Sequence, residues 1–148
     1  MSSLINIHSV IPSSRVNGPG SRMVIFFQGC NQDCHGCFNP DTHSFDKINL
    51  YTPEDIFKKH LRKGIEGITV SGGEPFLQAK GLYLLLKTAR RAYNLTTVVY
   101  TGFEYNNLKK DSDCKSCLEF IDVLIDGRYE ESKKETTLLA RGSTNQRF

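Results

Sequence analysis

The sequence lacks the features that mark several large classes of protein. No apolar run approaches the roughly 18 residues that a membrane-spanning helix needs. The first residues do not place an apolar segment after a basic one, as a secretory signal does. The formal net charge of +3 is too small to indicate binding to nucleic acid. We therefore expect a cytoplasmic protein with no membrane and no nucleic-acid partner.

Several common catalytic motifs are missing as well. The chain has no phosphate-binding P-loop, no dinucleotide-binding glycine fingerprint and no arrangement typical of a serine triad. It also has no internal repeat, no low-complexity tract and no linker, and its 148 residues match the usual size of one domain. We expect a single domain over residues 1–148 with an ordinary hydrophobic core.

Cysteine is the residue type that carries the most information. Five cysteines in a chain expected in the cytoplasm favour metal or redox chemistry over disulfide bonds. Three of them, Cys30, Cys34 and Cys37, have the spacing C-x3-C-x2-C. A structural zinc site takes four ligands, so this cysteine loop is one ligand short.

Two interpretations of the cysteine loop are open. In the first, Cys114 and Cys117, or His35 or His43, complete a zinc site, and the protein is a non-enzymatic zinc or electron-transfer module. In the second, the three thiolates bind three irons of a 4Fe-4S cluster, and the fourth iron keeps an open position for a substrate. The second interpretation explains why a fourth nearby cysteine is absent.

Apolar runs alternate with amphipathic segments along the rest of the chain. The patterns predict strands at residues 22–28, 67–71, 96–101 and 120–126, and helices from Pro53 to near Gly64 and over residues 79–93. This alternation is typical of an α/β fold with a mostly parallel sheet of βα units. About four units fit, which is too few for an eight-stranded barrel, so we expect a partial (half) TIM-type barrel.

Each predicted strand ends in a glycine-containing turn. These turns are Gly29-Cys30, Ser71-Gly72-Gly73-Glu74, Thr101-Gly102 and Asp126-Gly127. In parallel α/β folds, ligands bind beyond the carboxyl ends of the strands, and glycine lets the backbone approach a ligand closely. Each glycine alone could serve only the turn, but the four together favour one shared ligand site.

The cysteine loop and these turns together resemble a known superfamily. C-x3-C-x2-C followed by Ser71-Gly72-Gly73-Glu74-Pro75 is similar to the radical S-adenosylmethionine enzymes. The segments 16–20, 122–127 and 141–147 (VNGPG, DVLIDG and RGSTNQR) are similar to the activases of glycyl radical enzymes, in particular those of anaerobic ribonucleotide reductases. Many superfamily members place an aromatic residue before the third cysteine, whereas here Gly36 precedes Cys37 and Phe38 follows it, a pattern that the reductase activases share.

The resemblance implies roles for individual residues. Cys30, Cys34 and Cys37 would ligate a 4Fe-4S cluster whose open iron binds S-adenosyl-L-methionine. The backbone of the GGE motif, Gly72-Gly73-Glu74, would bind the cofactor, and the Glu74 carboxylate would contact its ammonium group. Three polar side chains would also contact the cofactor. The cofactor-binding residues are then Asn39, Ser71, Gly72, Gly73, Glu74 and Thr101.

Some of these residues have a simpler interpretation. Asn39 precedes Pro40 and could only shape that turn. Asp126 could orient an incoming glycine loop or a cation, or it could only form an Asp-Gly turn. Cys114 and Cys117 could bind zinc or a second metal centre; the simpler expectation is that one or both are free thiols in the helix before the fourth strand.

The implied reaction is a one-electron cleavage of S-adenosylmethionine. It yields methionine and a 5′-deoxyadenosyl radical, which takes a hydrogen from a glycine of an anaerobic ribonucleotide reductase large subunit. Another glycyl radical protein or a peptide is the alternative target. The chain shows no flavin site of its own, so a low-potential electron donor such as flavodoxin or ferredoxin is expected as a second partner.

Overall fold

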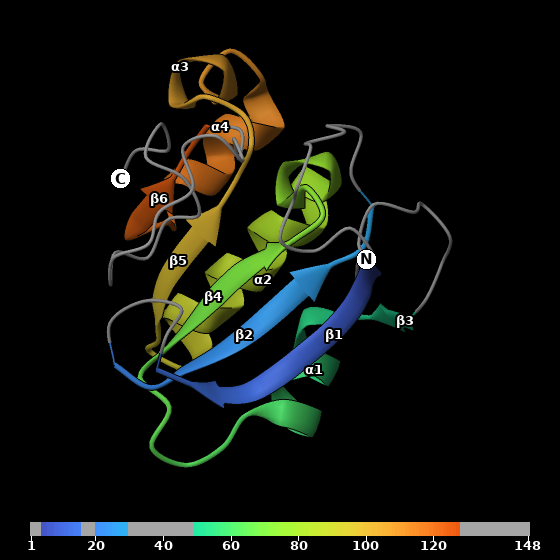
Figure 1. Ribbon diagram of the computed structural model, residues 1–148, viewed down its shortest axis with the longest axis vertical. Coiled ribbons are helices and arrows are strands. Elements are labelled where there is room, and N and C mark those ends of the chain that lie inside the picture. Colours follow the sequence, from blue (N-terminus) through green and yellow to red (C-terminus); the bar gives the residue numbers. More distant parts are fainter. Residues whose placement is uncertain (1–3, 16–19, 30–48, 128–148) are drawn as a thin grey trace, which may run out of the picture.

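The fold is built on one mixed sheet of six strands, in the order β3-β1-β2-β4-β5-β6 (Figure 1). The computed structural model describes residues 4–15, 20–29 and 49–127. Strands β2, β4, β5 and β6 are parallel to one another, whereas β1 pairs antiparallel with both β2 and β3. The strands are β1 (Ile5–Ser14), β2 (Arg22–Phe27), β3 (Asn49–Tyr51), β4 (Gly67–Gly72), β5 (Thr96–Tyr100) and β6 (Val123–Ile125).

The described helices are α1 (Pro53–His60), α2 (Ala79–Ala92), α3 (Tyr105–Leu108) and α4 (Ser112–Leu118), with a 3-10 turn η2 (Pro75–Gln78) before α2. Helices α1 and α2 cover one face of the sheet, and α3 lies beyond the end of β5 (Figure 1). This arrangement confirms the predicted α/β class and the four parallel strands. No helix in the described part of the chain combines the length and the apolar character needed to cross a bilayer.

Helix α1 begins where the sequence predicts and ends earlier. The Thr52 hydroxyl accepts from Asp55 N, the Asp55 carboxylate accepts from Thr52 N, and Pro53 opens the first turn. The helix stops at His60, not near Gly64, because Leu61 adopts an extended backbone conformation and packs against the core.

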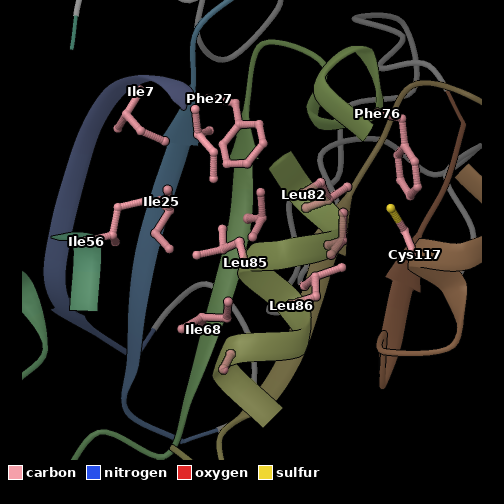
Figure 2. Close-up of a cluster of buried hydrophobic side chains, with 14 of the residues drawn as sticks. Ile7, Ile25, Phe27, Ile56, Ile68, Phe76, Leu82, Leu85, Leu86 and Cys117 are labelled. Atoms are coloured by element: carbon pink, nitrogen blue, oxygen red, sulfur yellow. The ribbon is translucent and has the colours of Figure 1, made fainter. Parts of the chain in front are cut away.

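The hydrophobic core lies between the sheet and helices α1 and α2 (Figure 2). On β2, every second side chain faces these helices, starting with Met23, and α2 supplies Leu82, Leu85, Leu86 and Ala89 at helical spacing. All of these side chains are fully buried. The core therefore fixes β2 and β4, which lead into the cysteine loop and the GGE motif.

Strands β1 and β3 were not predicted. Pro12 lies within β1, where it argues against a strand, and β3 has only three residues. The structure accommodates Pro12 because β3 pairs only with residues 5–7 of β1, and the pairing with β2 becomes irregular between Ile11 and Ser14. Proline is tolerated at such an unpaired or irregular position because no ladder hydrogen bond is lost there.

The last strand is shorter than predicted. Residues 120–121 belong to a turn after α4, in which Phe120 N donates to Cys117 O and Ile121 N donates to Leu118 O. The Asp122 carboxylate accepts from Thr97 N at 2.8 Å. These bonds replace strand pairing, so β6 begins only at Val123.

Arg22 holds the amino-terminal ends of three strands together. Its side chain is 1 % exposed and lies on the sheet face opposite α2. The guanidinium donates to Thr69 Oγ1 at 2.9 Å, Thr96 Oγ1 at 2.8 Å, Ile68 O at 2.7 Å and Thr96 O at 2.9 Å. A planar group with five donors suits this set of acceptors, because it reaches from β2 across β4 to β5.

We expect Arg22→Met to lower the free energy of unfolding by about 3 kcal/mol, since it leaves buried acceptors without their donors. The matched control Arg15→Met removes an exposed arginine whose Nε donates to Ser21 Oγ at 3.2 Å. It should change stability by less than about 0.5 kcal/mol. Urea unfolding midpoints at an unchanged m-value measure both effects. Equal midpoints for the two variants would contradict this role of Arg22.

Candidate functional site

The carboxyl ends of the four parallel strands meet at one edge of the sheet, as expected from the sequence. We call this the C-terminal edge; it comprises residues 71–74, 101–105 and 126–127 with Gly29. Three of its glycines, Gly29, Gly72 and Gly127, have φ of 106°, 104° and 97°. A side chain would strain the backbone at these values, so glycine is needed at all three turns.

The GGE motif is bonded to the start of the cysteine loop. Gly73 N donates to Phe27 O at 2.8 Å, and Glu74 N donates to Gly29 O at 2.8 Å. Gly29 directly precedes Cys30 in the sequence. The two motifs that the resemblance connects are therefore neighbours in the fold where the cysteine loop begins. The predicted ligands Cys30, Cys34 and Cys37, and the predicted cofactor contact Asn39, lie outside the described residues.

Glu74 is buried at the centre of this edge, with 1 % of its surface exposed. Its Oε2 accepts from Phe76 N at 3.0 Å and from Thr101 Oγ1 at 2.7 Å, and its Oε1 accepts from Gly102 N at 2.7 Å. Burial raises the pKa of this carboxyl from its usual 4.5 to about 7, although the three hydrogen bonds lower it. The side chain therefore joins the end of β4 to the end of β5.

Thr101 and Ser71, two other predicted contacts, also lie at this edge. Thr101 is buried, and its hydroxyl donates to Glu74 and accepts from Phe103 N at 3.1 Å. Ser71 is half-buried at the end of β4, opposite Phe26 of β2. The structure therefore brings together Ser71, Gly72, Gly73, Glu74 and Thr101 on neighbouring strands.

Asp126 lies at the end of β6 and is 3 % exposed. Its Oδ2 accepts from Tyr105 N at 2.7 Å, at the first residue of α3. Next to it, Gly127 N donates to Phe103 O at 3.0 Å. Asp126 thus bonds the chain segment that follows β5, and its role toward a substrate stays a prediction.

Gln78 belongs to the site and was not predicted. Its side-chain amide accepts from Asn6 N at 2.8 Å and donates to Asn6 O at 3.0 Å and to Gln28 O at 3.2 Å. It therefore bonds η2 to the ends of β1 and β2. In the sequence, Gln78 is only a glutamine four residues after Glu74. Its role could not be predicted, because it depends on the pairing of β1 with β2, which the sequence did not predict.

Cys114 and Cys117 are buried free thiols in α4, as expected. Burial raises the pKa of both thiols to about 12. Cys117 Sγ donates to Ala79 O at 3.3 Å and lies near Phe76 in Figure 2. Among the residues that the structure describes, no group of three or more His, Cys, Asp or Glu side chains could hold a metal ion.

Comparison with known proteins shows the family to which the chain belongs. Residues 16–148 match the family described as a 4Fe-4S single cluster domain. The chain is 33 % identical to the anaerobic ribonucleoside-triphosphate reductase-activating protein of Pasteurella multocida, over 96 % of this chain and 95 % of that protein. The chain belongs to this family of activating proteins.

Other relatives of this activating-protein family agree. The protein of the same name from Enterobacteria phage T4 is 32 % identical over 97 % of this chain and 93 % of its own length. The pyruvate formate-lyase-activating enzyme of Clostridium pasteurianum is 37 % identical over 70 % of this chain, but over only 46 % of its own length. These findings confirm the predicted radical S-adenosylmethionine activase class, with a 4Fe-4S cluster and S-adenosylmethionine as cofactors.

Gly72 provides a direct test of the packing at this edge. A Cβ atom there would lie 2.4 Å from Phe27 O and 2.5 Å from Phe27 N, whereas at Gly64, with φ of 89°, it would meet nothing within 4 Å. We expect Gly64→Ala to cost about 1 kcal/mol of stability for backbone strain alone. Gly72→Ala should cost about 3 kcal/mol or more. Thermal unfolding measures the stability of both variants. Equal losses of stability in Gly64→Ala and Gly72→Ala would contradict the close packing of Gly72 against Phe27.

Glu74 should make stability depend on pH. Below pH 4.5 the carboxyl is protonated in both folded and unfolded chains; between 4.5 and about 7 only the folded chain keeps the proton. The contribution of this group to stability therefore falls as pH rises through that range, by about 3 kcal/mol in total.

The measurement is urea unfolding at a series of pH values. Glu74→Gln should flatten the decline between pH 4.5 and 7, whereas the control Glu54→Gln, at an exposed position of α1, should retain it. The same pH dependence in Glu74→Gln and the unmodified protein would contradict the raised pKa.

Proposed function

We propose that this protein generates a glycyl radical on an anaerobic ribonucleoside-triphosphate reductase. The observation that carries the proposal is the identity of about a third, over nearly the full chain, with proteins named as activators of that reductase. The bond between Glu74 N and Gly29 O supports it, because the GGE motif then adjoins the first residue before the cysteine loop.

The cysteine loop has the donor set for the cluster. Cys30, Cys34 and Cys37 are three closely spaced thiols, which suit three irons of a 4Fe-4S cluster and leave one iron for S-adenosylmethionine. Cys114 and Cys117 do not suit this role, since they are buried with strongly raised pKa values. When bound, the cluster would supply the electron that cleaves S-adenosylmethionine, and the cofactor would supply the 5′-deoxyadenosyl group that takes a hydrogen atom from the target glycine.

The residues of the C-terminal edge bind and orient the cofactor. Gly72 and Gly73 present their backbone without side chains, and Ser71 offers a hydroxyl group at the end of β4. Thr101, on the neighbouring strand, contributes through its bond to Glu74. Glu74 belongs to the same site, and Asn39 is the remaining proposed contact. Asp126 is proposed to orient the glycine loop of the target, from the end of β6.

We assign residues 1–148 to one domain and the parallel strands β2, β4, β5 and β6 to a partial TIM-type barrel of the radical S-adenosylmethionine class. A cytoplasmic location and an external low-potential electron donor, such as flavodoxin or ferredoxin, follow from the same function. A different glycyl radical protein is the second candidate target, favoured by the similarity to a pyruvate formate-lyase-activating enzyme.

Anaerobic reconstitution with iron and sulfide tests the chemistry. The protein should bind about four irons per chain and, once reduced, should convert S-adenosylmethionine to methionine and 5′-deoxyadenosine. Cys34→Ala should lose this activity, and the matched control Cys114→Ala should keep it. A colourless protein that binds one zinc ion would overturn the proposal in favour of the zinc module.

The target is tested by adding an anaerobic ribonucleotide reductase to the reduced protein and S-adenosylmethionine. Electron paramagnetic resonance should then detect a glycyl radical on the reductase. If 5′-deoxyadenosine forms and no radical appears on the reductase, the target is a different protein.

A further inference from the structure

The segment 101–105, between β5 and α3, is held from two sides by buried carboxyl groups. From the β4 side, Glu74 accepts from Thr101 Oγ1 and Gly102 N, both at 2.7 Å. From the β6 side, Asp126 accepts from Tyr105 N at 2.7 Å. Thr101 N also donates to Ile125 O of β6 at 3.0 Å, and the bonds to the two carboxyl groups hold the residues that follow.

Two further bonds complete this arrangement. Phe103 N donates to Thr101 Oγ1 at 3.1 Å, and Phe103 O accepts from Gly127 N at 3.0 Å. Thr101 thus relays the position of Glu74 to Phe103. The segment is bonded at residues 101, 102, 103 and 105.

The chemistry of this position favours a carboxyl group. Two backbone N–H groups and one hydroxyl converge on Glu74, and an ionised carboxylate only accepts. A glutamine would direct an N–H₂ group at one of these donors. If Glu74 is protonated, it can donate to Thr101 Oγ1, so the link to β5 exists in both protonation states.

We propose that Glu74 is a positioning residue for S-adenosylmethionine. Its carboxyl fixes residues 101–102 against residues 72–74, so that the ends of β4 and β5 form one rigid binding surface. It acts through Thr101 and Gly102, which differs from a direct contact between the carboxylate and the cofactor's ammonium group. This inference rests on the proposed function, because it assumes that S-adenosylmethionine binds at the C-terminal edge.

The first test is a double-mutant cycle in the reconstituted holoprotein, with affinity for S-adenosylmethionine measured by equilibrium dialysis. Glu74→Gln and Thr101→Val should each weaken binding by about tenfold. Because both variants break the bond between Glu74 and Thr101, the double variant should also lose about tenfold. A loss of about a hundredfold in the double variant, or unchanged affinity in Glu74→Gln, would overturn the proposal.

Two further variants separate positioning from general loss of stability. Thr101→Ser keeps the hydroxyl and should restore nearly the original affinity. Thr97→Val makes the same substitution as Thr101→Val at the opposite end of β5, where a buried hydroxyl donates to Phe120 O at the amino-terminal side. It should lower stability and leave affinity unchanged. An equal loss of affinity in Thr97→Val would mean that Thr101→Val acts only through stability.

Turnover and hydrogen exchange give independent readouts. In Glu74→Gln, KM for S-adenosylmethionine should rise about tenfold while kcat stays within about twofold. In the protein before reconstitution, the Gly102 and Phe103 amides should exchange at least about tenfold faster, and the amide of Thr69 in β4 should not change. Unchanged exchange at Gly102 would overturn the inference without touching the proposed function, whereas failure of the unmodified holoprotein to bind S-adenosylmethionine would overturn the function itself.

Discussion

The hydrogen bonds of Glu74 are the interaction on which the C-terminal edge depends. Through its backbone N–H, Glu74 bonds the end of β2, and through its buried carboxyl it bonds the end of β5. Parallel strands bring their ends to one edge, but they do not by themselves determine how the turns beyond them lie. Glu74 fixes the turn after β5 relative to the turn after β4, since its side chain bonds Gly102, which is 28 residues away in the sequence.

At the amino-terminal ends of the parallel strands, a second buried charged side chain, Arg22, also connects neighbouring strands by hydrogen bonds. Arg22 donates to hydroxyl and carbonyl oxygens of β4 and β5, whereas Glu74 accepts from N–H and hydroxyl groups. Burying either group costs desolvation energy, and satisfied hydrogen bonds offset this cost only when their geometry is good. Each side chain therefore specifies how the strands lie relative to each other more than it adds to their overall stability.

Periodicity in the sequence was sufficient for the parallel strands and for α1 and α2, because these elements bury one continuous apolar face. It failed for β1, where Pro12 argues against a strand and only the local irregularity of pairing explains why it is tolerated. For the site, the glycine turns predicted a shared edge, but no local pattern shows that three donors converge on Glu74 or that Gln78 bonds Asn6. Such contacts join distant segments, so they follow only from the fold.

The burial of Cys114 and Cys117 bears on how the cluster is assembled. A protein that acquires iron and sulfide must direct them to the correct thiols among all those that it carries, and only the thiolate form is a good ligand. Two of the five thiols, Cys114 and Cys117, are enclosed by α4 and α2 and kept protonated, so the folded chain would leave iron to the three proposed ligands, Cys30, Cys34 and Cys37. Folding before metal loading would thus give selectivity in cluster biogenesis without an additional recognition site.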